Sequence, residues 1–155
     1  MGVQIDWLDA DSVSNYIIAA CPCTIIDLIW DKVKHLLELP INLSHGEATL
    51  TSTYNKLKSG ESLLITISDK DVVIAVCTIE VRTFESGIKA LYIPLIGGKN
   101  MNLWMDRFIE IAKGIAKDFG CTELRGIAAR KGWMRKLQPL GWEEVSTVIK
   151  YNIGE

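Results

Sequence analysis

The segment most able to do chemistry is a glycine-rich turn at positions 97–102, Gly-Gly-Lys-Asn-Met-Asn, which joins a strand-like run to a helical one. A strand that feeds a helix through glycines directs backbone N–H groups at one spot, at the positive end of the helix dipole. That spot suits a phosphate or a carboxylate, and Lys99 adds a positive charge. The alternative is a tight turn in which Asn100 or Asn102 only caps the helix.

Metal or redox chemistry has little support in the sequence. The two histidines, His35 and His45, are ten residues apart, which matches no standard pair of metal ligands. Cys21 and Cys23 flank one proline and lie closer together than the Cys-x2-Cys pair of zinc sites. We therefore predict no metal site and four reduced, mostly buried thiols, including Cys77 and Cys121.

A small basic cluster surrounds Trp133 near the carboxyl end. It suits an acidic partner or a nucleic acid, on whose bases arginine and an aromatic ring can stack, or it is simply a solvated charged edge. The formal net charge of −2 gives no broad attraction to nucleic acid, so nucleic acid is not the expected partner. The cluster comprises Arg125, Arg130, Lys131, Arg135 and Lys136.

The elements that would position these groups change type near residue 60. Helical periodicity and capping residues predict three helices in the first part of the chain, with Pro40 ending the second and Gly60 ending the third. These helices are expected from Asp11 or Ser12 to Ala20, from Ile25 to Leu39, and from Ala48 to Ser59.

The second part of the chain predicts a mixed sheet. Three β-branched runs with short turns indicate an antiparallel meander, and a strand after the next helix should lie parallel to the third run. Gly114 lies inside that helix, where close approach to a strand would explain it. The predicted order is strands 62–67, 72–82 and 89–96, helix 103–119, strand 122–128, helix 132–140 and strand 144–153.

Length and composition fit one domain, residues 1–155, with an N-terminal helical part over 1–60 and a sheet core over 62–153. With 48% hydrophobic residues, the chain has enough apolar material for a core. No apolar run approaches the length that crosses a bilayer, and the amino terminus lacks the pattern of a signal peptide. We therefore expect a cytosolic α/β (α+β) protein without a membrane partner.

The order of elements resembles the core of the GNAT acetyltransferase superfamily over roughly residues 62–153. The resemblance is carried by Leu91-Tyr-Ile-Pro-Leu-Ile-Gly-Gly, by the helix and strand after it, and by the segment from Gly132 to Gly141-Trp142. In that family a strand–loop–helix holds the pyrophosphate of acetyl-CoA, and the following strand splays away to admit the pantetheine arm. The resemblance implies a GNAT-like fold with acetyl-CoA or CoA as cofactor and no metal.

A closer likeness is to small GNAT-like proteins encoded by tailed bacteriophages. Their pattern is a Gly-Gly-[Arg/Lys]-[Asp/Asn]-Met-x-x-Trp turn, a helix ending in Gly-Cys, and a Gly-Trp…Leu…Gly-aromatic segment. This sequence matches with the turn from Gly97 to Trp104, with Gly120-Cys121, and with the segment from Gly132 to Trp142. The likeness implies a viral protein in the host cytoplasm or associated with the virion.

The resemblance also implies which residues form the site. Glu80, on the long strand, is the candidate base that takes a proton from an amine, and Tyr92, on the next strand, is a candidate proton donor. The alternatives are a solvent-facing Glu80 and a partly buried aromatic Tyr92. The candidate cofactor-binding residues are Ile96, Gly97, Gly98, Lys99, Asn100, Met101 and Asn102.

Two departures from the family pattern shape the functional hypothesis. The turn lacks the family's usual Arg/Gln-x-x-Gly-x-Gly/Ala loop, and Leu137 stands where many members carry a tyrosine, five residues before the final aromatic Trp142. We therefore predict a phage-encoded protein with reduced or absent acetyl transfer, a binding or assembly factor with a phage or host protein partner. The alternative is an active acetyl-CoA-dependent N-acyltransferase. The acceptor and the oligomeric state are not fixed by the sequence.

Overall fold

The computed structural model describes residues 3–5, 16–128 and 131–154 and contains one six-stranded sheet. The strands follow one another in the order of the sequence, and every neighbouring pair is antiparallel except the last, in which β5 and β6 run parallel. The strands are β1 (Val3–Ile5), β2 (Tyr16–Cys21), β3 (Leu63–Asp69), β4 (Val72–Thr83), β5 (Lys89–Gly98) and β6 (Glu123–Gly126).

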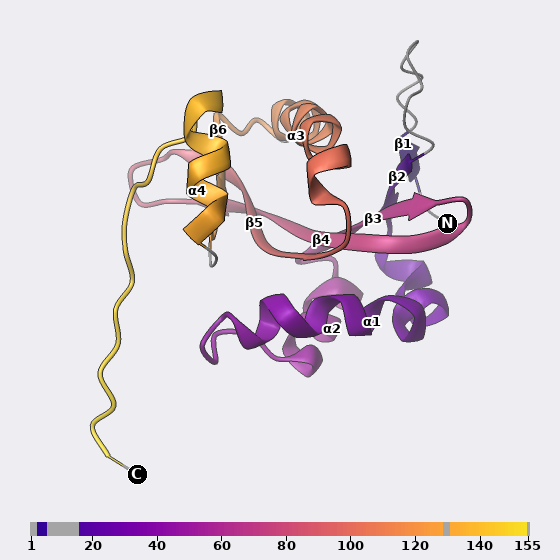
Figure 1. The fold of residues 1–155 in the computed structure, drawn as a ribbon, viewed down its shortest axis with the longest axis horizontal. Helices are drawn as coiled ribbons and strands as arrows, with labels where there is room; N and C mark the ends of the chain where they lie inside the picture. Colours follow the sequence, from indigo (N-terminus) through magenta and orange to yellow (C-terminus); the bar gives the residue numbers. More distant parts are fainter. Residues whose placement is uncertain (1–2, 6–15, 129–130, 155) are drawn as a thin grey trace.

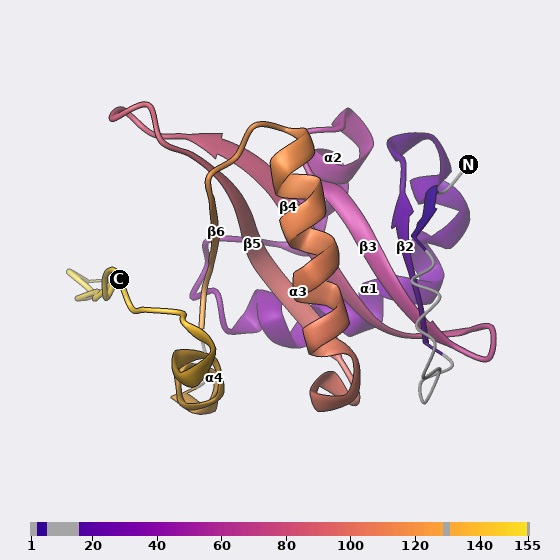
Figure 2. The ribbon, with the colours of Figure 1, turned by 90° about the horizontal axis from the view of Figure 1, so that it is seen from above.

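Helices cover both faces of this sheet (Figures 1 and 2). On one face lie α1 (Ile26–Asn42) and α2 (Leu50–Ser59), and on the other lies α3 (Met101–Asp118). The short α4 (Lys131–Leu137) and a following 3-10 turn (Gln138–Leu140) lie beside β6. Mixed strand directions with helices on both faces confirm the predicted α/β class.

Each face of the sheet has its own hydrophobic cluster. The α3 face buries Trp104 and Phe108 against alternate residues of β2 to β5, while the α1/α2 face buries Val33, Leu37 and Leu57 against the other set. β4 is buried on both faces, which explains its nearly continuous run of β-branched and small residues. The predicted meander of β3, β4 and β5 and the helix after it are confirmed.

For α2 the sequence predicted the glycine at its end, Gly60, and the structure confirms it. Thr49 and Ser52 form a reciprocal capping box at its start, and Gly60 ends it with φ of 84°.

None of the helices in the described part of the chain is long and apolar enough to span a bilayer.

The predicted first helix is wrong where the structure describes it. Tyr16–Cys21 is a strand, β2, which pairs antiparallel with β3 along its whole length, from Tyr16 opposite Asp69 to Cys21 opposite Leu64. Pairing with the neighbouring strands β1 and β3 outweighed the local helical pattern. The proposed capping residues Asp11 and Ser12 lie outside the described residues.

Pro40 does not end α1, which continues to Asn42 with Pro40 inside its last turn. A proline has no N–H, so the carbonyl of Leu36 loses the donor it would have four residues later. The Leu36 carbonyl oxygen lies close to Gly97 of β5, since a Cβ added to Gly97 would be 1.9 Å from it. The prediction missed a tertiary contact that involves both residues.

Two further predictions are wrong. Gly114 does not approach a strand, because it is exposed and a Cβ added there would meet no atom within 4 Å.

The final strand predicted for 144–153 does not form either. Residues 143–153 have no regular structure and are exposed, and the segment runs away from the body (Figure 1). An apolar alternating run becomes a strand only where another strand supplies hydrogen-bond partners.

Candidate functional site

The turn at residues 97–102 is held on the α1 side by Gly97. A Cβ built on Gly97 would lie 1.9 Å from the Leu36 carbonyl oxygen and 3.1 Å from Cδ of Pro40. No side chain fits in that space, so glycine lets β5 pack directly on α1. Packing against α1 therefore requires glycine at position 97, which the sequence alone did not reveal.

Gly98 is closed in from the other direction. It is the last residue of β5, its φ is 128°, and an added Cβ would lie 2.3 Å from the carbonyl oxygen of Ile74 and 2.5 Å from Cβ of Ala75. Both the backbone conformation and the neighbouring strand require glycine here. The Gly-Gly pair is thus part of the sheet and does not form a flexible loop above it.

The rest of the turn is anchored by three hydrogen bonds. The amide of Lys99 donates to the carbonyl of Ile74 over 3.0 Å, and the indole Nε1 of Trp104 donates to the carbonyl of Lys99 over 2.8 Å. Asn100 has a φ of 59° and its side-chain amide donates to Oη of Tyr16 over 3.4 Å. The turn is therefore pinned to β4, α3 and β2.

This anchoring limits which backbone N–H groups of the turn are available to bind an anion. The Lys99 amide is already bonded, and Asn100 is the N-cap residue but makes no side-chain cap. Because the first N–H groups of a helix have no partner within it, the amides of Met101 and Asn102 are the donors that point along the helix axis. Lys99 and Asn102 are exposed beside them, while Met101 and Ile96 pack on the α3-face cluster.

Next to the turn, β5 carries a bulge. Thr78 pairs with Leu95 but Glu80 pairs with Tyr92, so two steps along β4 match three along β5 and the extra residue lies at Ile93 or Pro94. The bulge reverses the side-chain direction, since Ile93 belongs to the α3-face cluster and Leu95 to the α1/α2-face cluster. Bulges of this kind often lie at functional sites.

Beyond the bulge, β5 and β6 separate. Their parallel pairing extends only to Ile93 opposite Gly126, although β5 continues to Gly98. Pro94, the first unpaired residue, has no N–H to give to a neighbouring strand. The part of β5 that leads into α3 is therefore not paired with β6, and this is where the sequence resemblance places a splay.

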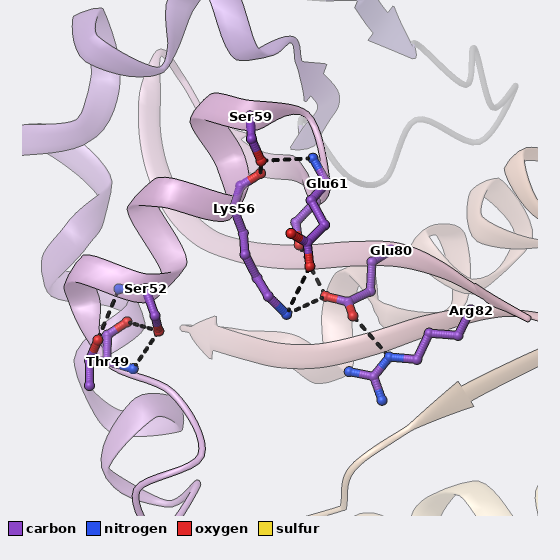
Figure 3. Close-up of polar contacts among 8 residues, drawn as sticks. Thr49, Ser52, Lys56, Ser59, Glu61, Glu80 and Arg82 are labelled. Atoms are coloured by element: carbon purple, nitrogen blue, oxygen red, sulfur yellow. Dashed lines mark hydrogen bonds and ion pairs between the residues drawn. The ribbon is translucent and has the colours of Figure 1, made fainter.

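Glu80 lies on the sheet face that α1 and α2 cover, at the centre of an ionic cluster (Figure 3). Its carboxylate accepts hydrogen bonds from the Ser62 hydroxyl at 3.0 Å and from Nε of Arg82 at 2.9 Å, and Nζ of Lys56 is 3.4 Å away. Burial raises the pKa of the Glu80 carboxyl, but the hydrogen bonds and the two positive charges outweigh burial and lower it. The cluster joins α2, the start of β3 and β4.

Tyr92 is the cross-strand neighbour of Glu80, and its ring lies under the guanidinium of Arg82, which is 3.6 Å from the ring centroid. On the other side Tyr92 pairs with Arg125 of β6. The structure therefore brings the two candidate catalytic residues together in one row of the sheet, with Tyr92 two residues before Pro94, the first residue of β5 that is not paired with β6. Their catalytic roles stay predictions.

Thr78 is a residue that the sequence analysis missed. It lies two positions before Glu80 on β4 and opposite Leu95, next to the β5 bulge. Its side chain is buried, and its hydroxyl has no hydrogen-bond partner among the residues that the structure describes. A buried hydroxyl without a partner is uncommon and marks this position as a candidate ligand contact. Only its place beside the bulge reveals it.

The residues of the predicted basic cluster lie on β6 and α4. Arg125 is bonded to Glu123 and lies over the ring of Phe84, whereas Arg135 and Lys136 are exposed on α4. Two different elements therefore supply these charges, and Arg130 lies outside the described residues.

The four cysteines are unpaired, three of them are buried, and burial raises the pKa of the Cys77 thiol. Both histidines are exposed. No group of three or more ligand-type side chains that could hold a metal occurs among the described residues.

Comparison with known proteins identifies the fold. No family model and no curated protein matches this chain in sequence. Among solved structures, a ribosomal-protein-alanine N-acetyltransferase from Brucella melitensis aligns with a TM-score of 0.63 and 13% identity, over 88% of this chain and 99% of the other. A predicted acetyltransferase from Clostridium acetobutylicum, solved with acetyl-CoA, aligns with a TM-score of 0.62 and 14% identity, over 89% and 96%.

A third structure, an aminoglycoside acetyltransferase from an uncultured soil metagenomic sample, aligns with a TM-score of 0.64 and 12% identity, over 92% of this chain and 99% of the other. These similarities span nearly the whole length of each neighbour. The chain therefore has the fold of the GNAT acetyltransferases, as the sequence resemblance predicted. At such low identity the likeness establishes the fold alone.

Proposed function

We propose that the protein binds a CoA thioester between the carboxyl ends of β5 and β6, where the two strands no longer pair. The observation that carries the proposal is the separation of these strands after Ile93 and Gly126, beside a bulge and next to the amino end of α3. An extended thiol arm fits between two strands that no longer bond to each other. Solved neighbours with this fold were crystallised with CoA and with acetyl-CoA, which supports the proposal.

The residues of this chain fit such a ligand at both ends. The amides of Met101 and Asn102, together with the exposed Lys99, would hold the diphosphate at the positive end of α3. Thr78 offers a buried hydroxyl without a partner near the bulge, where the thioester end would lie. The hydrogen bonds that pin the turn reduce the ordering that binding would require.

We further propose that acyl transfer to an amine is slow. Transfer forms a C–N bond, breaks the C–S bond and moves a proton from the amine towards the departing thiolate. Efficient transfer needs a base with a pKa near the working pH, whereas the pKa of Glu80 is lowered. Leu137, at the position of the family's usual tyrosine, packs on the α3-face cluster and has no proton to give.

A thermal shift experiment tests binding. CoA or acetyl-CoA at about 100 times its Kd should stabilise the protein by roughly 2.7 kcal/mol, which is about 5–10 °C in Tm for a domain of this size. Lys99→Ala should weaken binding by about 5- to 10-fold. The control is Lys117→Ala, which removes an exposed lysine at the opposite end of α3 and should leave binding unchanged. Absence of any shift at millimolar CoA would overturn the proposal.

Transfer is tested separately by following free thiol release from acetyl-CoA with a panel of primary amines. We expect release only slightly above the rate without protein, and we expect Glu80→Gln to leave that rate unchanged. Rapid release that Glu80→Gln abolishes would instead establish Glu80 as the base and the protein as an active N-acyltransferase.

The sequence motifs of the turn and of the Gly132–Trp142 segment also lead us to propose a tailed bacteriophage origin, with activity in the host cytoplasm or on the virion. Head and packaging genes beside the gene for this chain would support that origin. Flanking genes of bacterial metabolism would contradict it.

A further inference from the structure

Two arginines of the sheet are each fixed by a glutamate of the same strand. On β4, Nε of Arg82 donates to the Glu80 carboxylate over 2.9 Å. On β6, Nε of Arg125 donates to the Glu123 carboxylate over 2.8 Å. Because each glutamate lies two residues before its arginine, the two side chains lie on the same face of their strand. We call Arg82 and Arg125 the arginine pair.

An aromatic ring supports each guanidinium of the arginine pair. The guanidinium carbon of Arg82 is 3.6 Å from the ring centroid of Tyr92. That of Arg125 is 4.3 Å from the ring centroid of Phe84. The two arginine side chains are only 38% and 31% exposed. The stacked ring and the bond at Nε fix the plane of each guanidinium, which reduces the freedom that the side chain would lose when a ligand binds.

The arginine pair lies on one face of the sheet, around Tyr92. Tyr92 is paired with Glu80 of β4 and with Arg125 of β6, and directly paired residues present their side chains to the same face. Arg82, two residues beyond Glu80, shares that face and lies over the ring of Tyr92. Side chains from three neighbouring strands therefore bring two guanidinium groups to one region.

The arginine pair keeps donors that its own chain does not use. A guanidinium has five N–H donors in a planar fork, and the bond to each glutamate uses the one at Nε. Within the described residues, the terminal Nη groups make no hydrogen bond or ion pair. Figure 3 shows the terminal nitrogens of Arg82 pointing away from Glu80. Both arginines can therefore donate to a further acceptor without giving up their glutamates.

The charges around the arginine pair favour an acceptor with a single negative charge. Lys56 lies 3.4 Å from Glu80 and 3.7 Å from Glu61, so its positive charge is shared between two carboxylates. A phosphate carries more negative charge than a carboxylate and would be repelled more strongly by the glutamates nearby. A carboxylate is planar and matches the fork of a guanidinium with two parallel hydrogen bonds.

We propose that the arginine pair binds the carboxylate of a small organic acid, which accepts hydrogen bonds from the Nη groups of both arginines. Tyr92 and Arg125 directly precede Ile93 and Gly126, the last paired residues of β5 and β6. The bound acid therefore lies beside the place proposed for the CoA thioester. That position rests on the proposed function, whereas the binding of the carboxylate itself does not require CoA.

NMR of the arginine side chains tests the proposal on the full chain without CoA. N-acetylglycine, a small carboxylate, should shift the Nε–Hε signals of the arginine pair and should saturate. N-acetylglycinamide, in which a neutral amide replaces the carboxylate, should leave both signals in place, and inorganic phosphate should bind about 5-fold or more weakly than N-acetylglycine. No shift with N-acetylglycine, equal shifts with the amide, or tighter binding of phosphate would overturn the proposal.

Variants of the arginine pair test whether the guanidinium forks make the contact. Arg125→Lys and Arg82→Lys keep the charge but lose the fork, and each should weaken binding of N-acetylglycine by about 5- to 10-fold. The matched control is Arg135→Lys on α4, where the arginine is exposed, and it should bind as the unchanged protein does. Thermal denaturation checks that each variant is folded. Unchanged binding in folded Arg82→Lys and Arg125→Lys would overturn the proposal.

The two proposals fail in different ways. If N-acetylglycine binds but CoA gives no thermal shift, the carboxylate site stands and the proposed CoA site falls. If CoA gives its shift but N-acetylglycine leaves the Nε–Hε signals of the arginine pair unmoved, the proposed CoA site stands and the carboxylate site is overturned.

Discussion

The turn at residues 97–102 and the carboxyl-terminal segment 143–154, called the tail below, both have a clear sequence pattern, but their surroundings are opposite. At the turn, backbone atoms of Leu36 and Ile74 approach so closely that Gly97 and Gly98 have no room for a Cβ. In the tail, Ile149 and Ile153 contact almost nothing and are more than 85% exposed. A pattern predicts the structure of a segment only when the fold supplies its partner.

The largest expected effect is at the closed-in turn. Gly97→Ala should destabilise the fold by about 3 kcal/mol or more, since the new Cβ would lie 1.9 Å from the Leu36 carbonyl oxygen and α1 would have to move. Chemical denaturation measures the change in the free energy of unfolding. A loss below about 1 kcal/mol would mean that α1 yields easily, and the contrast between turn and tail would fail.

The ionic cluster of Glu80 is the second test of how tightly the middle of the sheet is held. Glu80→Gln weakens charged hydrogen bonds to Ser62 and Arg82 and should cost about 1–2 kcal/mol. Glu110→Gln is the matched control, because it removes an exposed pair with Lys113 and should change stability by less than about 0.5 kcal/mol. Equal effects of the two variants would show that Glu80 contributes no more than a surface ion pair.

The same carboxyl predicts a dependence of stability on pH. The pKa of Glu80 lies below its ordinary value of 4.5 in the folded protein, so its contribution to stability is present above pH 4.5 and is lost as the pH falls towards the folded pKa. Denaturation curves across that window should therefore show falling stability, with a smaller slope in Glu80→Gln. Asp27, whose pKa is also lowered, adds to the slope in both proteins. Identical slopes in the two proteins would contradict the contribution of Glu80.

The same contrast explains how much the sequence could predict. Helices α1, α2 and α3 and the β3–β5 meander were predicted because periodicity and caps are local signals. β2 was missed because its strand character comes from pairing with β3, more than 40 residues away. Thr78 was missed because the β5 bulge that makes it notable depends on the register of two strands. Glu80 was named as a candidate from its place on the strand, but the hydrogen bonds that lower its pKa depend on residues of α2 and β3 that only the fold brings near.

The smallest expected effect is a gain in stability at Gly114, which has open surroundings as the tail does. Gly114 lies in the interior of α3, is exposed, and has no atom within 4 Å of the position of an added Cβ. Alanine there restricts the unfolded chain and favours the helix, so Gly114→Ala should stabilise the protein by roughly 0.5–1 kcal/mol. Thermal denaturation would detect this as a rise of a few degrees in Tm. Gly97→Ala adds the same methyl group but is expected to lower stability. Comparing the two variants therefore separates the effect of the surroundings from the effect of replacing a glycine. Loss of stability in Gly114→Ala would contradict the open surroundings of Gly114.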